Sequence, residues 1–169
     1  MKKLIAMILV LAMAVTMVAC GKKAADKTPL TGTMEENALK VMEIAPVEFM
    51  GATIPVDLAD VDALYYFTGL RDASKITDAA VYESMLGAQA FSLVMVRTAE
   101  GADTKAIAQE MKDNIDPRKW ICVGTDEVMA AGYGNTVLFI MTDSMMGLHA
   151  QSYVDAFAQV TGGELDFTI

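Results

Sequence analysis

The sequence predicts one small α+β domain, with helices on one face of an antiparallel or mixed sheet. Three observations carry this prediction. Apolar residues recur every second position in some stretches, as in strands, and every three or four positions in others, as in helices. Short runs with glycine or proline separate these stretches. Removing the first 19 of the 169 residues leaves 150, which suits a single domain with its own core.

Residues 1–19 have the pattern of a secretory signal peptide. Lys2 and Lys3 precede an apolar run from Leu4 to Ala19. Sixteen residues make a helix of roughly 24 Å, which is shorter than a hydrocarbon core of about 30 Å. A signal peptide is therefore favoured over a transmembrane helix.

The end of this run, Met17-Val18-Ala19-Cys20, resembles the lipobox of bacterial lipoprotein precursors. Ala19 and Cys20 match that motif, whereas Met17 stands where leucine is usual and Val18 where a small residue is commoner. The resemblance implies cleavage between Ala19 and Cys20 and attachment of a diacylglyceryl group, with acyl chains such as palmitate, to Cys20. Two acyl chains anchor a protein stably. We therefore expect an extracytoplasmic lipoprotein on the outer face of the cytoplasmic membrane; a soluble secreted product and an uncleaved anchor are the alternatives.

Residues 20–33 are predicted to be the lipidated cysteine and a flexible tether, because they are small, polar and interrupted by Pro29 and Gly32. The α+β domain is expected to span residues 34–169. Its first helix begins at a capping box formed by Thr33 and Glu36. Pro46 ends this helix, whose apolar face is predicted to carry Met34, Ala38, Met42 and Ala45, with Leu39 and Val41 beside them.

Asp57, Asp60 and Asp62 precede an apolar run that Gly69 ends. Three carboxylates could bind a hard cation, but the glycine and distal glutamate of a calcium loop are missing. Carboxylates at a helix N-terminus cap free N–H groups. We therefore favour a capped helix over a metal site.

Strands are predicted over residues 79–84 and 90–97, and the second of these is apolar on both faces, as in a central strand. Asp103 then caps a helix that Pro117 ends. The inward residues of this helix are expected to be Ile107, Met111 and Ile115.

Gly134-Asn135 connects two further predicted strands, residues 128–133 and 136–142, as a hairpin with positive φ angles in its turn. Gly132 and Gly134 are not a phosphate loop, because the connection joins two strands and does not open a helix. Asp143 or Ser144 is expected to cap the last helix, which Gly162 ends. A short strand with Leu165, Phe167 and Ile169 on one face follows.

The order of strand, helix, hairpin, helix and strand is that of a ferredoxin-like βαββαβ unit, here with an N-terminal helical extension. The alternative is a different α+β order, in which residues 79–84 take the edge of the sheet beside residues 91–97 and displace the terminal strand.

The charge and the cysteines restrict the kinds of partner. Without Lys2 and Lys3, the chain has 11 of its 13 basic residues and 22 acidic ones, which gives a net charge of −11. Binding to nucleic acid is therefore not expected. Cys122 lies among apolar residues, where a small buried side chain is commoner than a nucleophile. With a single histidine, His149, and no C-x-x-C pair, we expect no metal site and no cofactor.

Arg118, Lys119 and Trp120 are the one place where an acidic chain presents adjacent basic and aromatic residues. In one interpretation Trp120 joins the core and the two cations lie near the negative end of the preceding helix. In the other, the three form an exposed patch for an anionic or carbohydrate partner in the envelope.

Three segments of the chain, Gly69-Leu70, residues 89–93 and residues 116–122, resemble an uncharacterised-domain family of surface lipoproteins from Gram-positive bacteria. The resemblance covers about residues 60–162. It implies a small α+β domain at the cell envelope and transfers no catalytic residue.

We therefore expect a membrane-anchored, non-enzymatic binding or assembly module that contacts an envelope protein or a cell-wall polymer. A small-ligand pocket between helices and sheet is the alternative. An envelope hydrolase is a further one, for which His149 and Ser152 on one helical face are the only pair, without an orienting acid or oxyanion donors.

Overall fold

The computed structural model describes residues 27–169, so the predicted signal peptide, its cleavage site and Cys20 lie outside the described residues. The helices are α2 (Met34–Ile44), α3 (Val61–Thr68), α4 (Thr104–Asn114) and α5 (Ala150–Thr161), with 3₁₀ turns η1 (Ala73–Lys75) and η2 (Ser144–Met146). The strands are β1 (Gly51–Pro55), β2 (Ile76–Ser84), β3 (Phe91–Thr98), β4 (Glu127–Tyr133), β5 (Thr136–Thr142) and β6 (Phe167–Thr168).

All six strands form one sheet in the order β1-β2-β3-β5-β4-β6, and every neighbouring pair is antiparallel. The prediction of a single α+β domain with an antiparallel sheet is thereby confirmed. The long strands β3 and β5 lie in the middle of the sheet and pair along their whole length, from Phe91 opposite Thr142 to Arg97 opposite Thr136.

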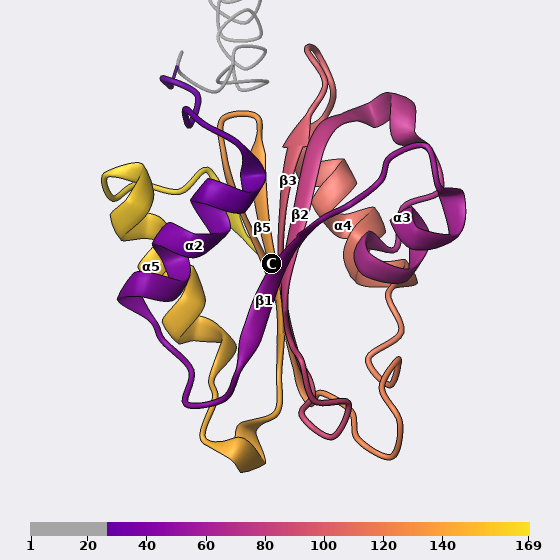
Figure 1. Ribbon diagram of the computed structural model, residues 1–169. Helices are drawn as coiled ribbons and strands as arrows, with labels where there is room; N and C mark the ends of the chain where they lie inside the picture. Colours follow the sequence, from indigo (N-terminus) through magenta and orange to yellow (C-terminus); the bar gives the residue numbers. More distant parts are fainter. Residues whose placement is uncertain (1–26) are drawn as a thin grey trace, which may run out of the picture.

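The helices cover both faces of this sheet, which differs from the one-face arrangement expected from the sequence. Figure 1 shows α2 and α5 on one side and α3 and α4 on the other. The physical reason lies in β3, whose residues are buried on both faces. Phe91, Leu93 and Met95 join the core under α2 and α5, whereas Val94 and Val96 join the core under α3 and α4. Two apolar faces require two layers of cover.

The strand order also corrects the ferredoxin-like topology. The terminal strand β6 pairs with β4, through Ala131 opposite Thr168, and β2 takes the place beside β3. The alternative order was right about the neighbour of β3 and wrong about the edge, because β1 pairs with the other side of β2 and takes the edge itself. A short connection joins β2 to β3, and pairing them closes a small loop at little entropic cost. The two-residue strand β6 could not replace the nine-residue β2 in that place.

Most predicted helix ends are confirmed. Thr33 and Glu36 form the capping box of α2, Asp60 accepts from the N–H groups of Asp62 and Ala63 at the start of α3, and Asp103 caps α4. The helices α3 and α5 end at left-handed glycines, Gly69 and Gly162. In the β4–β5 turn only Gly134 has a positive φ angle, 57°. The expected positive φ angle at Asn135 is therefore wrong.

The cap of α5 was predicted at the wrong residues. Asp143 caps the 3₁₀ turn η2 instead, by accepting from the N–H of Met145, and α5 begins seven residues after Asp143, at Ala150. Its first N–H, on Ala150, donates to the Glu127 carboxylate of β4 over 2.7 Å. A carboxylate from a strand that is distant in the sequence therefore caps this helix, and no local sequence pattern predicts such a cap.

Candidate binding surface and a buried lysine

The predicted trio Arg118, Lys119 and Trp120 lies in the loop between α4 and β4. The loop closes on itself where the N–H of Thr125 donates to the carbonyl of Pro117 over 2.9 Å. Arg118 is exposed and Trp120 is half-buried. The Lys119 side chain is only 3% exposed, so the structure does not place the two cations side by side on the surface.

Lys119 is held by a carboxylate from the sheet. Its Nζ lies 2.6 Å from Oε1 of Glu83 in β2, whose side chain is 12% exposed. The Oγ of Ser92 lies 3.4 Å from Nζ and the carbonyl oxygen of Tyr66 lies 3.5 Å from it. An ammonium has three N–H donors, and three oxygens surround this one.

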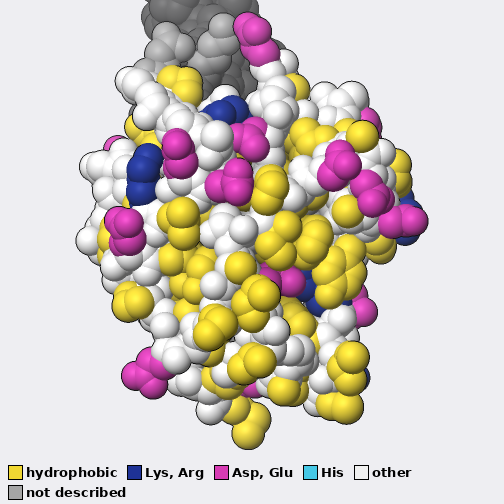
Figure 2. All heavy atoms as spheres, in the orientation of Figure 1, with side chains coloured by type: hydrophobic (Ala, Val, Ile, Leu, Met, Phe, Trp, Pro, Cys, Tyr) yellow, Lys and Arg dark blue, Asp and Glu magenta, His cyan; other side chains and the backbone are white. Residues whose placement is uncertain are grey.

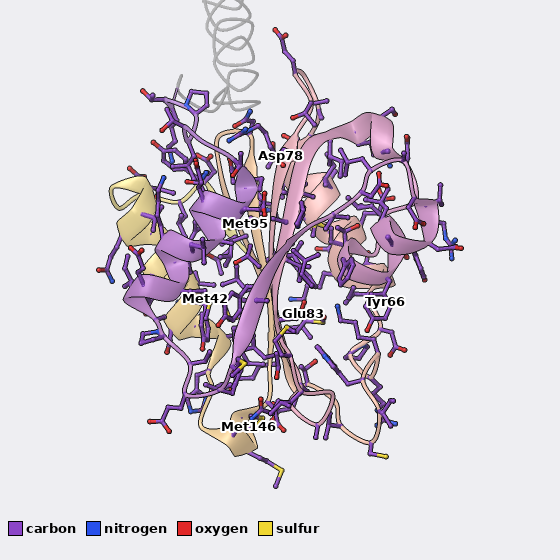
Figure 3. All side chains as sticks on the ribbon, in the orientation of Figure 1. Met42, Tyr66, Asp78, Glu83, Met95 and Met146 are labelled. Atoms are coloured by element: carbon purple, nitrogen blue, oxygen red, sulfur yellow. The ribbon has the colours of Figure 1, made fainter. Side chains whose placement is uncertain are left out.

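Aromatic rings complete the surroundings of this ammonium. Nζ lies 4.8 Å from the ring centre of Tyr66 and 5.3 Å from those of Phe67 and Trp120. Such distances allow cation–π attraction, which gains strength away from water. Figure 3 labels both Glu83, which comes from β2, and Tyr66, which comes from α3.

Burial is the main electrostatic influence at this site. It lowers the pKa of Lys119 from its ordinary value, and the negative charge of Glu83 opposes that shift. Burial, with a smaller contribution from the charge of Glu83, also raises the pKa of Tyr66. The sequence analysis missed Glu83. A signal was present, because Glu83 is two positions from the apolar Val81 and so shares its sheet face. An acidic residue on a buried face of a strand requires a partner.

Large apolar side chains are exposed around β1 and the loops at one end of the domain. Figure 2 shows apolar side chains gathered along the middle of this side of the molecule, with most acidic side chains around them and an acidic and a basic side chain among them. Met50 is 75% and Met145 93% exposed. We use the name apolar surface for four exposed residues in or next to β1 and the end of β2: Met50, Ile54, Met85 and Leu86.

The outer edge of β1 offers backbone groups to a further strand. The N–H of Val56 donates to Ala79 and the N–H of Met85 donates to Met50. With the observed register, these bonds place the N–H and C=O groups of Ala52 and Ile54 toward β2. Those of Gly51 and Thr53 therefore point to the outer edge, where the sheet of the described chain ends.

The charge near β1 has one sign. Between Val41 and Leu70 the chain has five acidic residues and no lysine or arginine. Glu48 and Asp57, one on each side of β1, are both exposed. This part of the surface is therefore complementary to a basic partner.

A solvent-open cavity lies beside the same end of the domain. Its volume is about 640 Å³. It is formed by the α2–β1 connection, the β2–β3 turn and the segment after η2, and its lining residues are Pro46, Glu48, Phe49, Gln89, Met146, Gly147 and Leu148.

The other candidates from the sequence have ordinary structural partners. Asp60 is a helix cap, and Asp57 accepts from the N–H of Ala59. Cys122 is exposed, in contrast to the buried side chain expected, because the loop carries it outward with a φ angle of 65°. Nδ1 of His149 lies 3.0 Å from Glu127, which holds the side chain at the start of α5.

Within residues 27–169, no three His, Cys, Asp or Glu side chains are grouped closely enough to hold a metal ion. None of the helices there combines the length and apolar character needed to cross a bilayer.

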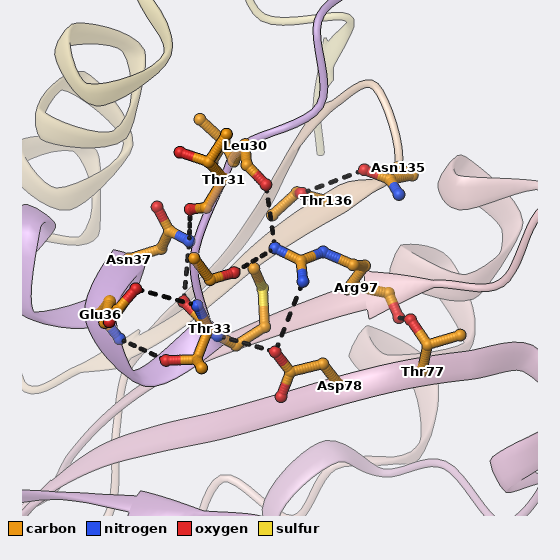
Figure 4. Close-up of polar contacts among 12 residues, drawn as sticks. Leu30, Thr31, Thr33, Glu36, Asn37, Thr77, Asp78, Arg97, Asn135 and Thr136 are labelled. Atoms are coloured by element: carbon orange, nitrogen blue, oxygen red, sulfur yellow. Dashed lines mark hydrogen bonds and ion pairs between the residues drawn. The ribbon is translucent and has the colours of Figure 1, made fainter.

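The described part of the predicted tether contacts the domain. The Arg97 guanidinium donates to the carbonyls of Leu30 over 2.9 Å and Gly32 over 2.7 Å, as Figure 4 shows. Lys27 lies 2.8 Å from Asp166. These residues of the predicted tether therefore contact the folded domain.

Comparison of the chain with models of protein families, with curated proteins and with solved structures finds no match.

Proposed function

We propose that this protein is a lipid-anchored, non-enzymatic module of the bacterial cell envelope that binds another envelope protein along β1. The observation that carries the proposal is the outer edge of β1, where Gly51 and Thr53 present unpaired backbone groups. Exposed apolar side chains adjoin that edge. The partner segment is extended, apolar and basic, because it pairs with a strand edge in an acidic region.

The anchor in this proposal is Cys20, as the resemblance to the lipobox implies. The arrangement of the domain supports an outward-facing binding surface. Figure 3 shows Met146 at the end of the molecule opposite the segment that leads in from residue 27. An anchor before residue 27 would leave the exposed methionines of that end, Met145 and Met146, directed away from the membrane. Methionine side chains suit such a role because they adapt to different partners.

Site-specific photo-cross-linking in cells of the native organism tests this proposal. A photoreactive amino acid at Met50 is expected to give one defined adduct, whereas the same group at Gln159, exposed on α5, gives none. Ile54→Lys in the Met50 variant should remove the adduct, since it adds charge to the apolar surface. Identical adduct patterns at Met50 and Gln159 would reject a binding surface at β1.

A small-ligand-binding role is the second candidate, and the cavity of about 640 Å³ favours it. Its volume falls within the range of small-molecule pockets. Gln89→Trp should fill the cavity. The test uses the fraction of a native-cell extract below about 1 kDa, which is on the order of metabolite size. If this fraction raises the Tm of the wild-type protein but leaves the Tm of Gln89→Trp unchanged, the second role is supported.

A further inference from the structure

The hollow around Glu83 has the chemistry of a receptor for a primary ammonium group. Its carboxylate lies 2.6 Å from the ammonium of Lys119, and two more oxygens lie within 3.5 Å. The rings of Tyr66 and Phe67 lie beside it. Carboxylate, neutral oxygens and ring faces together are the groups by which proteins recognise organic cations.

We propose that this hollow is a binding site for primary alkylammonium ligands, which the chain itself occupies with Lys119 until a ligand takes the place of that side chain. The ligand class follows from the three oxygens, because only a primary ammonium has three N–H donors to match them. A quaternary ammonium has none.

The groups that form the receptor belong to regular elements. Glu83 and Ser92 face each other across β2 and β3, and Tyr66 and Phe67 lie on α3. The occupant comes from a loop without helix or strand. The receptor therefore keeps its carboxylate, its two oxygens and two of its three rings when the loop moves.

Between Trp120, which packs against the core, and Thr125, which bonds to Pro117, the loop that carries Lys119 has few attachments. Within the described chain, the backbone groups of residues 120–124 form no backbone–backbone hydrogen bond. Ile121 is 81% exposed, and Cys122 is exposed as well. A cavity of about 360 Å³ lies within the loop, between Arg118, Trp120 and Gly124. Because Ile121 and Cys122 are already exposed to solvent, Lys119 can leave its place without uncovering these two residues.

Competition with the chain weakens binding to the wild-type protein. A tethered side chain acts at an effective concentration on the order of millimolar, and a ligand binds only the fraction of molecules in which Lys119 is out. Removal of the lysine side chain removes this competition. The variant Lys119→Ala leaves room for the three carbons and the nitrogen of n-propylammonium.

Titration of the full chain, purified in detergent, with n-propylammonium chloride tests the proposal. Trp120 is the only tryptophan, so its fluorescence reports the loop. We expect a saturable change in the wild type and in Lys119→Ala, with the apparent Kd at least tenfold lower in the variant. Equal concentrations of n-propanol, tetramethylammonium chloride and sodium chloride should give no saturable change.

A second variant separates the site from general ionic effects. Glu83→Gln combined with Lys119→Ala should raise the Kd for n-propylammonium at least tenfold over Lys119→Ala alone. The proposal is overturned if the wild type gives no saturable change, if n-propanol matches n-propylammonium, or if the double variant binds as well as Lys119→Ala. If Lys119→Ala does not fold, the wild-type titration and its controls decide alone.

Discussion

The two faces of the sheet are closed in different ways. Under α2 and α5 the core is apolar throughout its centre, with Phe91, Leu93 and Phe157 fully buried. Under α3 and α4 the helices leave one end of the sheet to a loop, which covers it with the half-buried Trp120 and with the ion pair of Lys119 and Glu83. Helical cover is stabilised by burial of apolar area. Loop cover depends on Trp120 and on one ion pair, and the ion pair is the part of that cover that a ligand can exchange.

The largest effect is expected on the helical side. Phe157→Ala should lower the free energy of unfolding by about 3–5 kcal/mol, because a fully buried ring leaves a cavity. Chemical denaturation measures it. Gln159→Ala, exposed on the same helix, is the control and should change stability by less than about 0.5 kcal/mol. Similar losses in both variants would mean that α5 is not held by its buried face.

On the loop side, Lys119→Met should lower the free energy of unfolding by about 3 kcal/mol, because Glu83 stays buried without its partner. Adding Glu83→Gln to Lys119→Met should recover most of the lost stability. A loss that is the same with and without Glu83→Gln would show that Lys119 acts through packing alone. Denaturation of the wild type and the two variants under one condition provides the comparison.

A change in the sheet itself should affect both faces alike. Gly134→Val should lower the free energy of unfolding by about 1 kcal/mol or more, because the φ angle of 57° strains a β-branched residue. The nearest atom to an added Cβ is 4.0 Å away, so strain and not collision is the cause. Gly87→Val, at a glycine without positive φ and with open space around it, is the control. An unchanged Tm for Gly134→Val would contradict the left-handed turn.

The smallest effect concerns Glu127, whose carboxylate contacts the start of α5. The hydrogen bond from His149, and then that from the Ala150 N–H, lower the pKa of Glu127 below its ordinary value of 4.5. A carboxyl group with a lowered pKa stabilises the folded state above its unfolded-state pKa, and this stabilisation is lost as the pH falls. In Glu127→Gln the free energy of unfolding should therefore fall less between pH 6 and pH 3 than in the wild type. Parallel pH profiles would contradict this contribution.

The sequence predicted what depends on local patterns. The caps at Thr33, Asp60 and Asp103 and the glycine at the end of α3 each follow from residues within one turn, and all were found. The long-range features escaped prediction. The pairing of Lys119 with Glu83 joins residues 36 positions apart through the fold, and Glu127 caps a helix 23 residues away.

The strand order was open for the same reason. Periodicity shows that β3 is buried on both faces but not which strands lie beside it. The edge position of β1, on which the proposed binding surface depends, follows only from the register of the whole sheet.

Hydrogen exchange of the protein in isolated native membranes tests binding along β1 most directly. The peptide that covers residues 50–56 should exchange at least tenfold more slowly in membranes than in the purified protein, because a partner strand would protect the N–H groups of Gly51 and Thr53. The α5 peptide should exchange equally in both samples. Equal exchange of the β1 peptide in membranes and in the purified protein would contradict the proposed binding surface.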